Sequence, residues 1–171
     1  MYEKSEVDSI PWPSRVLLPY CLNKTNYATI LASRGCYGVC SFCSNQSFER
    51  SSIGPTWRGR DPIDVVDEIE NLHSQYGVKV IKFNDPNLFG PGPEGRQHVV
   101  QLCQEIMRRN LSSLHLMGFC RSNDLDLEVA KMMRKAGFER LLIGIESANP
   151  EVLKLFRKGE SLQTIHRSIE I

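Results

Sequence analysis

The sequence predicts an α/β protein built on a parallel sheet, and three observations support this fold class. Apolar, strand-like segments alternate regularly with segments of helical periodicity. This strand–helix–strand spacing is typical of right-handed βαβ units. The polar residues that could carry chemistry follow directly after the strand segments, where parallel α/β folds bind their ligands. The sheet is expected to be either open or curved toward a barrel.

The first 26 residues are predicted to form an irregular linker or arm. They are mostly polar, and Pro11, Pro13 and Pro19 argue against a continuous helix. The ordered domain is expected to span residues 27–171. It begins with a strand over residues 27–33, which has no breaker before Gly35.

A helix with clear end signals follows. Asp61 and Pro62 supply an N-cap and a first-turn proline, and Gly77 ends the helix. Its apolar face consists of Val65, Ile69, Leu72 and Tyr76. A second strand over residues 78–84 and a loop over residues 85–95, rich in proline and glycine, come next.

The same alternation continues to the end of the chain. The apolar face of the second helix, which ends near Asn110, contains Cys103 and so places this thiol in the core. The remaining predicted elements are a strand at 114–120, a helix at 127–136 closed by Gly137, a strand at 140–145, a short helix at 149–159 and a helix from Leu162 onward.

Composition excludes several classes of protein. With 41% hydrophobic and 24% charged residues, the chain can bury a core and is not intrinsically disordered. Lys and Arg total 21 against 20 Asp and Glu, so no basic field argues for nucleic acid or a membrane surface. No apolar run approaches the roughly 18 residues of a membrane helix. No secretory signal is visible, and a cytoplasmic location without disulfides is expected.

Three of the six cysteines, Cys36, Cys40 and Cys43, form a C-x3-C-x2-C cluster within eight residues. Thiolates at this spacing can converge on one soft metal centre. Structural zinc takes four ligands, usually in two pairs, and no second pair is evident. Ordinary ferredoxin clusters also use four cysteines, so three would leave one iron open to bind a substrate or cofactor. Cys21, Cys103 and Cys120 are interpreted as ordinary thiols, and the four histidines as solvated or satisfied.

The cluster and its surroundings resemble the radical S-adenosylmethionine superfamily. The likeness rests on S-R-G-C-Y-G-V-C-S-F-C-S and extends to the stretches D-P-I-D-V-V-D-E-I-E, C-R-S-N-D-L-D and I-G-I-E-S-A-N-P-E. It is greatest to the branch whose members often carry an N-terminal cobalamin-binding domain, and I-P-W-P-S-R-V-L-L-P resembles the linker that follows that domain. The resemblance implies a partial parallel barrel with about four of the usual six βα units.

The resemblance also implies an activity. Members of the family hold a [4Fe–4S] cluster and reductively cleave S-adenosylmethionine to methionine and a 5′-deoxyadenosyl radical. An external electron donor such as flavodoxin or ferredoxin, and a substrate that the sequence does not identify, are then expected partners. Methyl transfer, cyclisation and methylthiolation are the expected reaction types. Cobalamin is expected only through a domain that these 171 residues do not contain.

Four further residues resemble family positions that contact S-adenosylmethionine, and a fifth, Arg121, is a candidate from its chemistry. Phe42 corresponds to an aromatic residue near the adenine, Asp85 to the residue that receives the amino group, and Glu146 with Ser147 to the ribose contact. Arg121 could pair with the methionine carboxylate. The structural alternatives are a loop cap for Asp85, a surface arginine for Arg121 and helix capping for Glu146 and Ser147. Charged residues interpreted as solvated surface are Arg58, Arg60, Arg108 and Arg109.

A second hypothesis remains open, namely a catalytically incompetent iron–sulfur or zinc-binding fragment. Only four strands are predicted, and the fourth would have an exposed apolar edge. Self-association, or pairing with a missing second half, is therefore expected.

Overall fold

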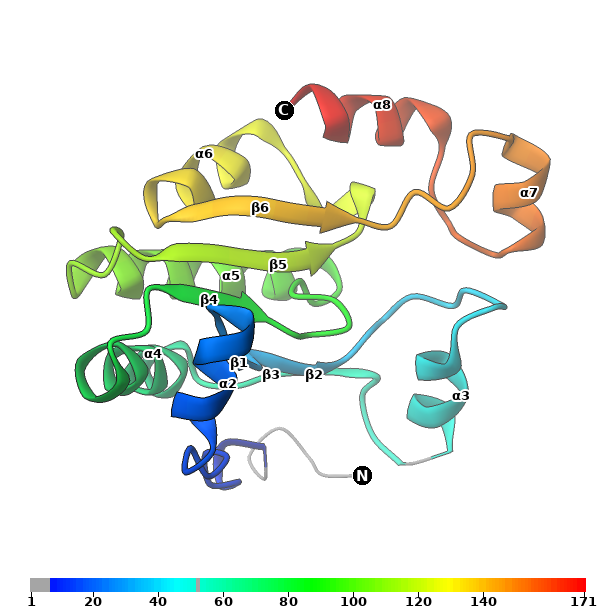
Figure 1. Ribbon diagram of the computed structural model, residues 1–171. Coiled ribbons are helices and arrows are strands. Elements are labelled where there is room, and N and C mark those ends of the chain that lie inside the picture. Colours follow the sequence, from blue (N-terminus) through cyan, green and yellow to red (C-terminus); the bar gives the residue numbers. More distant parts are fainter. Residues whose placement is uncertain (1–6, 52) are drawn as a thin grey trace.

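The computed structural model describes residues 7–51 and 53–171 and is built around a four-stranded parallel sheet (Figure 1). The strands are β1 (Ala28–Ile30), β4 (Val80–Phe83), β5 (His115–Cys120) and β6 (Phe138–Ile143), in that spatial order. Each new strand adds to the same side of the previous one, as in a barrel and unlike the reversal of a doubly wound sheet. The predicted α/β class and partial barrel are therefore confirmed.

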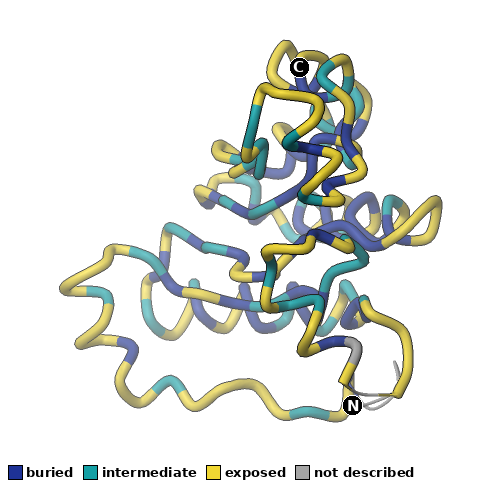
Figure 2. The backbone as a smooth tube through the Cα atoms, turned by 90° about the vertical axis from the view of Figure 1, so that its right-hand side faces the viewer, coloured by how far each residue is buried: buried dark blue, intermediate teal, exposed yellow. Residues whose placement is uncertain are grey.

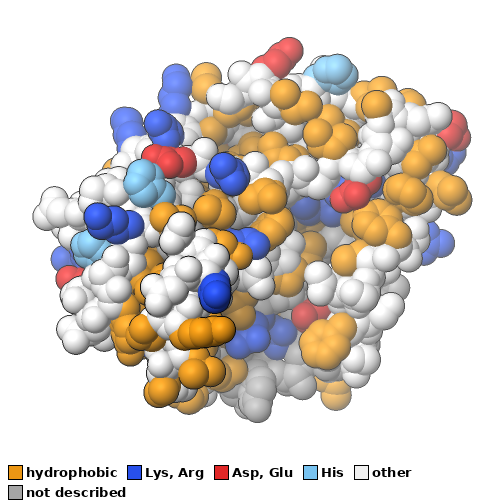
Figure 3. Space-filling view, viewed as in Figure 1, with side chains coloured by type: hydrophobic (Ala, Val, Ile, Leu, Met, Phe, Trp, Pro, Cys, Tyr) orange, Lys and Arg blue, Asp and Glu red, His pale blue; other side chains and the backbone are white. Residues whose placement is uncertain are grey.

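Three helices cover one face of this sheet, namely α4 (Pro62–Tyr76), α5 (Gly92–Arg108) and α6 (Leu127–Lys135). Ile81 and Phe83 of β4 are completely buried on the helix side, whereas Lys82 between them is partly exposed on the other side. Buried segments run through the middle of the molecule and exposed ones lie outside (Figure 2). The view in Figure 3 shows hydrophobic side chains with Lys and Arg among them.

The predicted helix ends are confirmed where capping residues mark them. Asp61 Oδ1 accepts a hydrogen bond from the Ile63 amide at 2.8 Å, and Gly77 ends α4 with φ of 64°. The predicted loop over residues 85–95 is wrong at its end, because α5 begins at Gly92. Pro93 lies in the first turn of α5, where its missing N–H costs nothing.

The first predicted strand is divided in two. β1 ends at Ile30, and Ser33–Gly35 forms β2, which pairs antiparallel with β3 (Trp57–Gly59) outside the main sheet. The chain turns away between them because the Ala32 carbonyl accepts from the Arg60 amide at 2.9 Å rather than from the main sheet. The last strand is also displaced, since β6 begins at Phe138 and ends at Ile143.

The prediction of an irregular arm over residues 1–26 is wrong for part of its length, and residues 1–6 lie outside the described residues. Helix α2 spans Leu18–Thr25 with Pro19 in its first turn, a position that proline tolerates. Val7 and Leu18 are buried against the rest of the protein. Residues 7–26, the N-terminal arm, are therefore a packed part of the fold.

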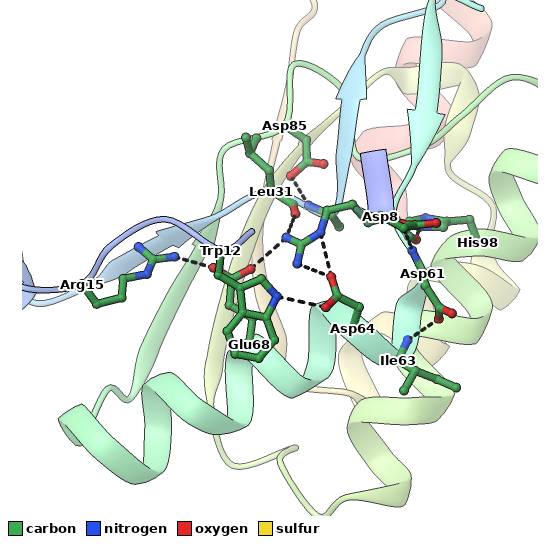
Figure 4. A network of polar contacts seen from close by, with 12 residues as sticks. Asp8, Trp12, Arg15, Leu31, Asp61, Ile63, Asp64, Glu68, Asp85 and His98 are labelled. Atoms are coloured by element: carbon green, nitrogen blue, oxygen red, sulfur yellow. Dashed lines mark hydrogen bonds and ion pairs between the residues drawn. The ribbon is translucent and has the colours of Figure 1, made fainter. Parts of the chain in front are cut away.

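A buried polar network ties this arm to α4 (Figure 4). Glu68 accepts hydrogen bonds from Arg15 at 2.6 Å and from Arg60 at 2.8 Å, and Arg60 also binds Asp64 at 2.6 Å. Trp12 Nε1 donates to Asp64 at 3.0 Å.

The arginines predicted to be solvated differ in their surroundings. Arg58 and Arg60 are buried, so the prediction is wrong for both. Arg109 is mostly covered and pairs with Asp67, Glu70 and Glu105, whereas Arg108 is exposed. Cys103 and Cys120 are buried as expected of ordinary core thiols, and burial raises the pKa of each to about 12.

The C-terminal part completes the described fold. Its elements are a short 3-10 helix, η1 (Ser122–Asp124), and the helices α7 (Pro150–Leu155) and α8 (Leu162–Glu170). Helix α3 (Ser44–Arg50) lies between β2 and β3 in the chain. No helix among the described residues is both long and apolar enough to cross a membrane.

Candidate functional site

The three clustered cysteines lie on one loop at the carboxyl edge of the sheet. This cysteine loop, residues 36–43, connects β2 to α3, and Cys43 is the residue immediately before α3. Cys40 is buried, and Cys36 and Cys43 are partly exposed. The Gly38 amide donates to Cys36 Sγ at 3.3 Å, and the Cys43 amide donates to the Cys40 carbonyl at 3.2 Å.

Burial is the main influence on the Cys36 thiol. It raises the Cys36 pKa, while the Gly38 amide and the Arg121 guanidinium oppose this effect. A thiol in this environment stays protonated until a metal or another cation stabilises its thiolate.

Arg121 lies directly against the cysteine loop. Its Nη1 donates to Cys40 Sγ at 3.5 Å, its Nη2 donates to the Lys158 carbonyl, and its guanidinium carbon lies 5.4 Å from the centre of the Tyr37 ring. A Cβ at Gly38 would lie 2.5 Å from Nη1, so a side chain at this position would require the guanidinium to shift. Arg121 is buried, so the surface-arginine alternative is wrong.

A chain of charges continues from Arg121 to the end of β6. Arg121 Nη2 lies 3.3 Å from Glu160, Lys158 Nζ lies 3.8 Å from the same carboxylate, and Lys158 Nζ is 4.0 Å from Glu146. These contacts connect the ends of β5 and β6 with the cysteine loop. The structure thus brings three of the predicted positions, Cys40, Arg121 and Glu146, into one region.

Tyr37 and Asp124 support the other side of the loop. The Tyr37 hydroxyl donates to Asp124, which also accepts from the Arg121 amide and from Asn87 Nδ2, both at 3.0 Å. Burial, reinforced by the neighbouring Asp124 carboxylate, raises the Tyr37 pKa, and burial also raises that of Asp124. Neutral tyrosine is therefore held as a hydrogen-bond donor.

Phe42 lies half-exposed at the tip of the loop. Its ring contacts Phe156 edge to face, with 5.0 Å between the centroids. The adjacent Ser41 amide donates to the Phe156 carbonyl at 2.9 Å. The segment after α7 therefore holds an aromatic pair beside the cysteines, and the predicted contact of Phe42 with adenine stays a prediction.

Asp85 has hydrogen-bond partners at Ala32 and Ser33 rather than in the cysteine loop. It is buried at the end of β4, where Ser33 Oγ donates to it at 2.6 Å and the Ala32 amide at 3.2 Å. Burial raises its pKa to about 6 although these hydrogen bonds oppose the shift. The geometry matches the loop-cap alternative, with Asp85 fastening the segment between β1 and β2.

Glu146 and Ser147 lie in the turn after β6 rather than on the strand. β6 ends at Ile143, two residues before the predicted end of this strand at residue 145, and Glu146 has a φ of 67°. Ser147 Oγ accepts from the Asn149 amide at 3.0 Å, while Asn149 itself caps α7. The Glu146 side chain is 38% exposed and is open to a ligand.

The cysteine loop suits a metal cluster by its donors. Within the described part of the chain, no group of three His, Cys, Asp or Glu side chains is arranged to hold a metal ion. The loop nevertheless carries three thiols on a short segment, and Gly38 between the first two lies close to the Arg121 guanidinium. Soft thiolate donors on such a loop match the ligation of iron–sulfur clusters.

Sequence reasoning missed Tyr37, Asp124, Lys158 and Glu160. Lys158 and Glu160 flank Gly159, which has a φ of 69°, and Arg121 contacts the Lys158 carbonyl and the Glu160 carboxylate. No periodicity in the sequence marks either residue as buried. Burial of two charged residues so close together is the feature that distinguishes them, and it is visible only in the folded chain.

Comparisons with known proteins agree with this geometry. The sequence profile of the radical SAM superfamily matches residues 30–171. An uncharacterized methyltransferase of Pyrococcus horikoshii is 32% identical over 156 residues, covering 90% of this chain and 32% of that protein. An anaerobic magnesium-protoporphyrin IX monomethyl ester cyclase of Synechocystis is 30% identical over 175 residues, covering all of this chain and 33% of that protein.

A solved structure is also similar. The radical S-adenosylmethionine methyltransferase TsrM of Kitasatospora setae, with cobalamin and a [4Fe–4S] cluster bound, superposes with a TM-score of 0.71 at 25% identity. The match covers 84% of this chain and 26% of that one. The chain spans about a third of the length of the two curated relatives above.

Proposed function

The chain belongs to the radical S-adenosylmethionine superfamily, and we propose that Cys36, Cys40 and Cys43 hold a [4Fe–4S] cluster that binds S-adenosylmethionine at its open iron. When bound, this pair supplies one-electron cleavage of S-adenosylmethionine to methionine and a 5′-deoxyadenosyl radical. The single observation that carries the proposal is the position of the three thiols on one loop at the carboxyl edge of a parallel sheet.

The residues around the loop would orient the ligand. Phe42, paired with Phe156, offers an apolar surface beside the cysteines for the adenine ring. Glu146 and Ser147, in the turn after β6, offer oxygen acceptors for ribose hydroxyls. The predicted contacts of Asp85 with the amino group and of Arg121 with the carboxylate stay predictions, since both side chains already have protein partners.

The open face of the sheet is the proposed substrate side. Lys82 lies there with its Nζ 5.7 Å from the Tyr27 ring centre and 5.3 Å from that of Phe119. Cations and aromatic rings on this face would suit an apolar or aromatic substrate with an anionic group.

Methyl transfer or cyclisation is the proposed reaction type, because the names of the relatives are those of methyltransferases and a cyclase. Methylthiolation has no such support. A flavodoxin- or ferredoxin-like protein would supply the electron, and a cobalamin cofactor would require a domain beyond these 171 residues.

The test is anaerobic reconstitution of the chain with iron and sulfide. The proposal predicts about four iron atoms per chain, brown colour and visible absorption that bleaches on reduction. Cys36→Ala, Cys40→Ala and Cys43→Ala should each lose the iron, whereas Cys21→Ala, which changes an exposed thiol, should retain it. A colourless zinc protein, or equal loss of iron in Cys21→Ala, would contradict the proposal.

A further inference from the structure

Arg121 makes a contact that a residue binding the methionine carboxylate would not need. Its Nη1 donates to Cys40 Sγ at 3.5 Å in a buried position. The Tyr37 ring, the Lys158 carbonyl and the Glu160 carboxylate hold the guanidinium in this position. The Arg121 side chain is 9% exposed, so little water screens its charge.

Glu160 contacts Nη2 of Arg121, whereas Cys40 accepts from Nη1 of the same guanidinium. Its side chain is completely buried, and neither of its oxygens accepts a hydrogen bond from the described residues. A buried carboxylate without hydrogen bonds is costly unless cations compensate it. Arg121 at 3.3 Å and Lys158 at 3.8 Å provide this compensation. Arg121, Lys158 and Glu160 thus form a buried group of charges in contact with the Cys40 thiol.

We propose that Arg121 is a positioning residue that orients Cys40 and raises the reduction potential of the cluster, with Glu160 as the buried counter-charge that fixes the guanidinium. The inference rests on the proposed function, because it concerns the cluster that the cysteine loop would hold.

The sign of the effect follows from charge. Reduction adds one electron and takes the cluster from the 2+ to the 1+ state, so a nearby positive charge stabilises the reduced form. A hydrogen bond donated to a ligating sulfur acts in the same direction. Removing the positive charge of Arg121 should lower the potential, and removing the negative charge of Glu160 should raise it.

The experiment is a redox titration of the reconstituted 171-residue chain with dithionite as the one-electron donor, followed by electron paramagnetic resonance. In Arg121→Gln the ratio of reduced to oxidised cluster at a fixed potential should fall about tenfold, which is 59 mV for a one-electron couple. In Glu160→Gln the ratio should rise, and Arg121→Lys, which keeps the charge, should lie closer to the wild type than Arg121→Gln. Arg108→Gln, a change at an exposed arginine in the last turn of α5, should have the wild-type potential.

Opposite shifts in Arg121→Gln and Glu160→Gln support the inference, because general loosening of the site would not move the potential in two directions. Equal potentials in the wild type and Arg121→Gln, or shifts of the same sign in both variants, would overturn it. If Arg121→Gln holds no iron, the Glu160→Gln potential decides: an upward shift supports the inference and no shift overturns it. A wild-type chain that holds no iron would overturn this inference and the proposed function together, whereas unchanged potentials in iron-loaded variants would overturn only the inference.

Discussion

Replacing Glu68 with Gln should destabilise the protein and release the N-terminal arm. Glu68 has a side chain that is 2% exposed, and it is the acceptor shared by Arg15 of the arm and Arg60, which lies just before α4. Glutamine keeps the size of the side chain but removes the charge that compensates two guanidinium groups.

The magnitude follows from the burial of the network. Breaking a buried ion pair by neutralising one partner typically costs about 3–5 kcal/mol. Arg60 retains Asp64 and the Leu31 carbonyl, and Arg15 retains the Thr29 carbonyl. We therefore expect the lower end, about 3 kcal/mol. For a domain of this size, such a loss lowers the melting temperature by roughly 6–12 °C.

Urea denaturation measures the free energy of unfolding, and limited proteolysis measures exposure of the arm. Glu68→Gln should show a lower denaturation midpoint and faster cleavage within the arm. The matched control is Glu128→Gln, which neutralises a carboxylate that is 82% exposed and pairs with Arg96; it should change stability by less than about 0.5 kcal/mol. A loss below about 1 kcal/mol in Glu68→Gln, or an equal loss in both variants, would refute the reasoning.

Three further predictions concern the site and the open edge of the sheet. Asp85 has a pKa of about 6 in the folded chain against an ordinary value of 3.8, so the folded state binds the proton more tightly than the unfolded state. This stabilisation, about 3 kcal/mol at most, is lost as pH rises from about 4 through about 6. Asp85→Asn should flatten the slope of unfolding free energy against pH, and an unchanged slope would contradict the prediction. Gly38→Ala should lower the iron content after reconstitution, because its Cβ would lie 2.5 Å from Arg121 Nη1. The control Gly118→Ala, whose Cβ has no contact closer than 3.4 Å, should keep its iron. Equal iron content in the two variants would argue against a close fit of the cysteine loop. β6 has no neighbour on its outer edge among the described strands, and Leu142 of this strand is 39% exposed. Light scattering should therefore detect self-association of the chain. A monomer at all protein concentrations would count against the exposed-edge prediction.

Local sequence determines some elements of this fold, and these could be predicted. Asp61 and Gly77 cap α4 through contacts within a few residues, so the sequence alone marks both ends of the helix. Pro19 shows the limit of this reasoning, because it prevents a helix from passing through it but permits one to begin there.

Contacts between distant segments could not be predicted. Arg60 reads as a surface residue until Arg15 and Glu68 are folded around it. Asp85 was open to interpretation as a ligand contact or a cap, and its partner Ser33 lies 52 positions away. The relation of Arg121 to Cys40 spans 81 positions, so only the fold places this guanidinium against the cysteine loop.

Electron paramagnetic resonance of the reduced, reconstituted chain, recorded with and without S-adenosylmethionine, tests the central claim most directly. If Cys36, Cys40 and Cys43 leave one iron open, S-adenosylmethionine should bind that iron and change the g values of the reduced cluster. S-adenosylhomocysteine, which lacks the sulfonium charge and methyl group, serves as the comparison ligand. An iron-loaded chain whose spectrum does not change at saturating S-adenosylmethionine would contradict the account.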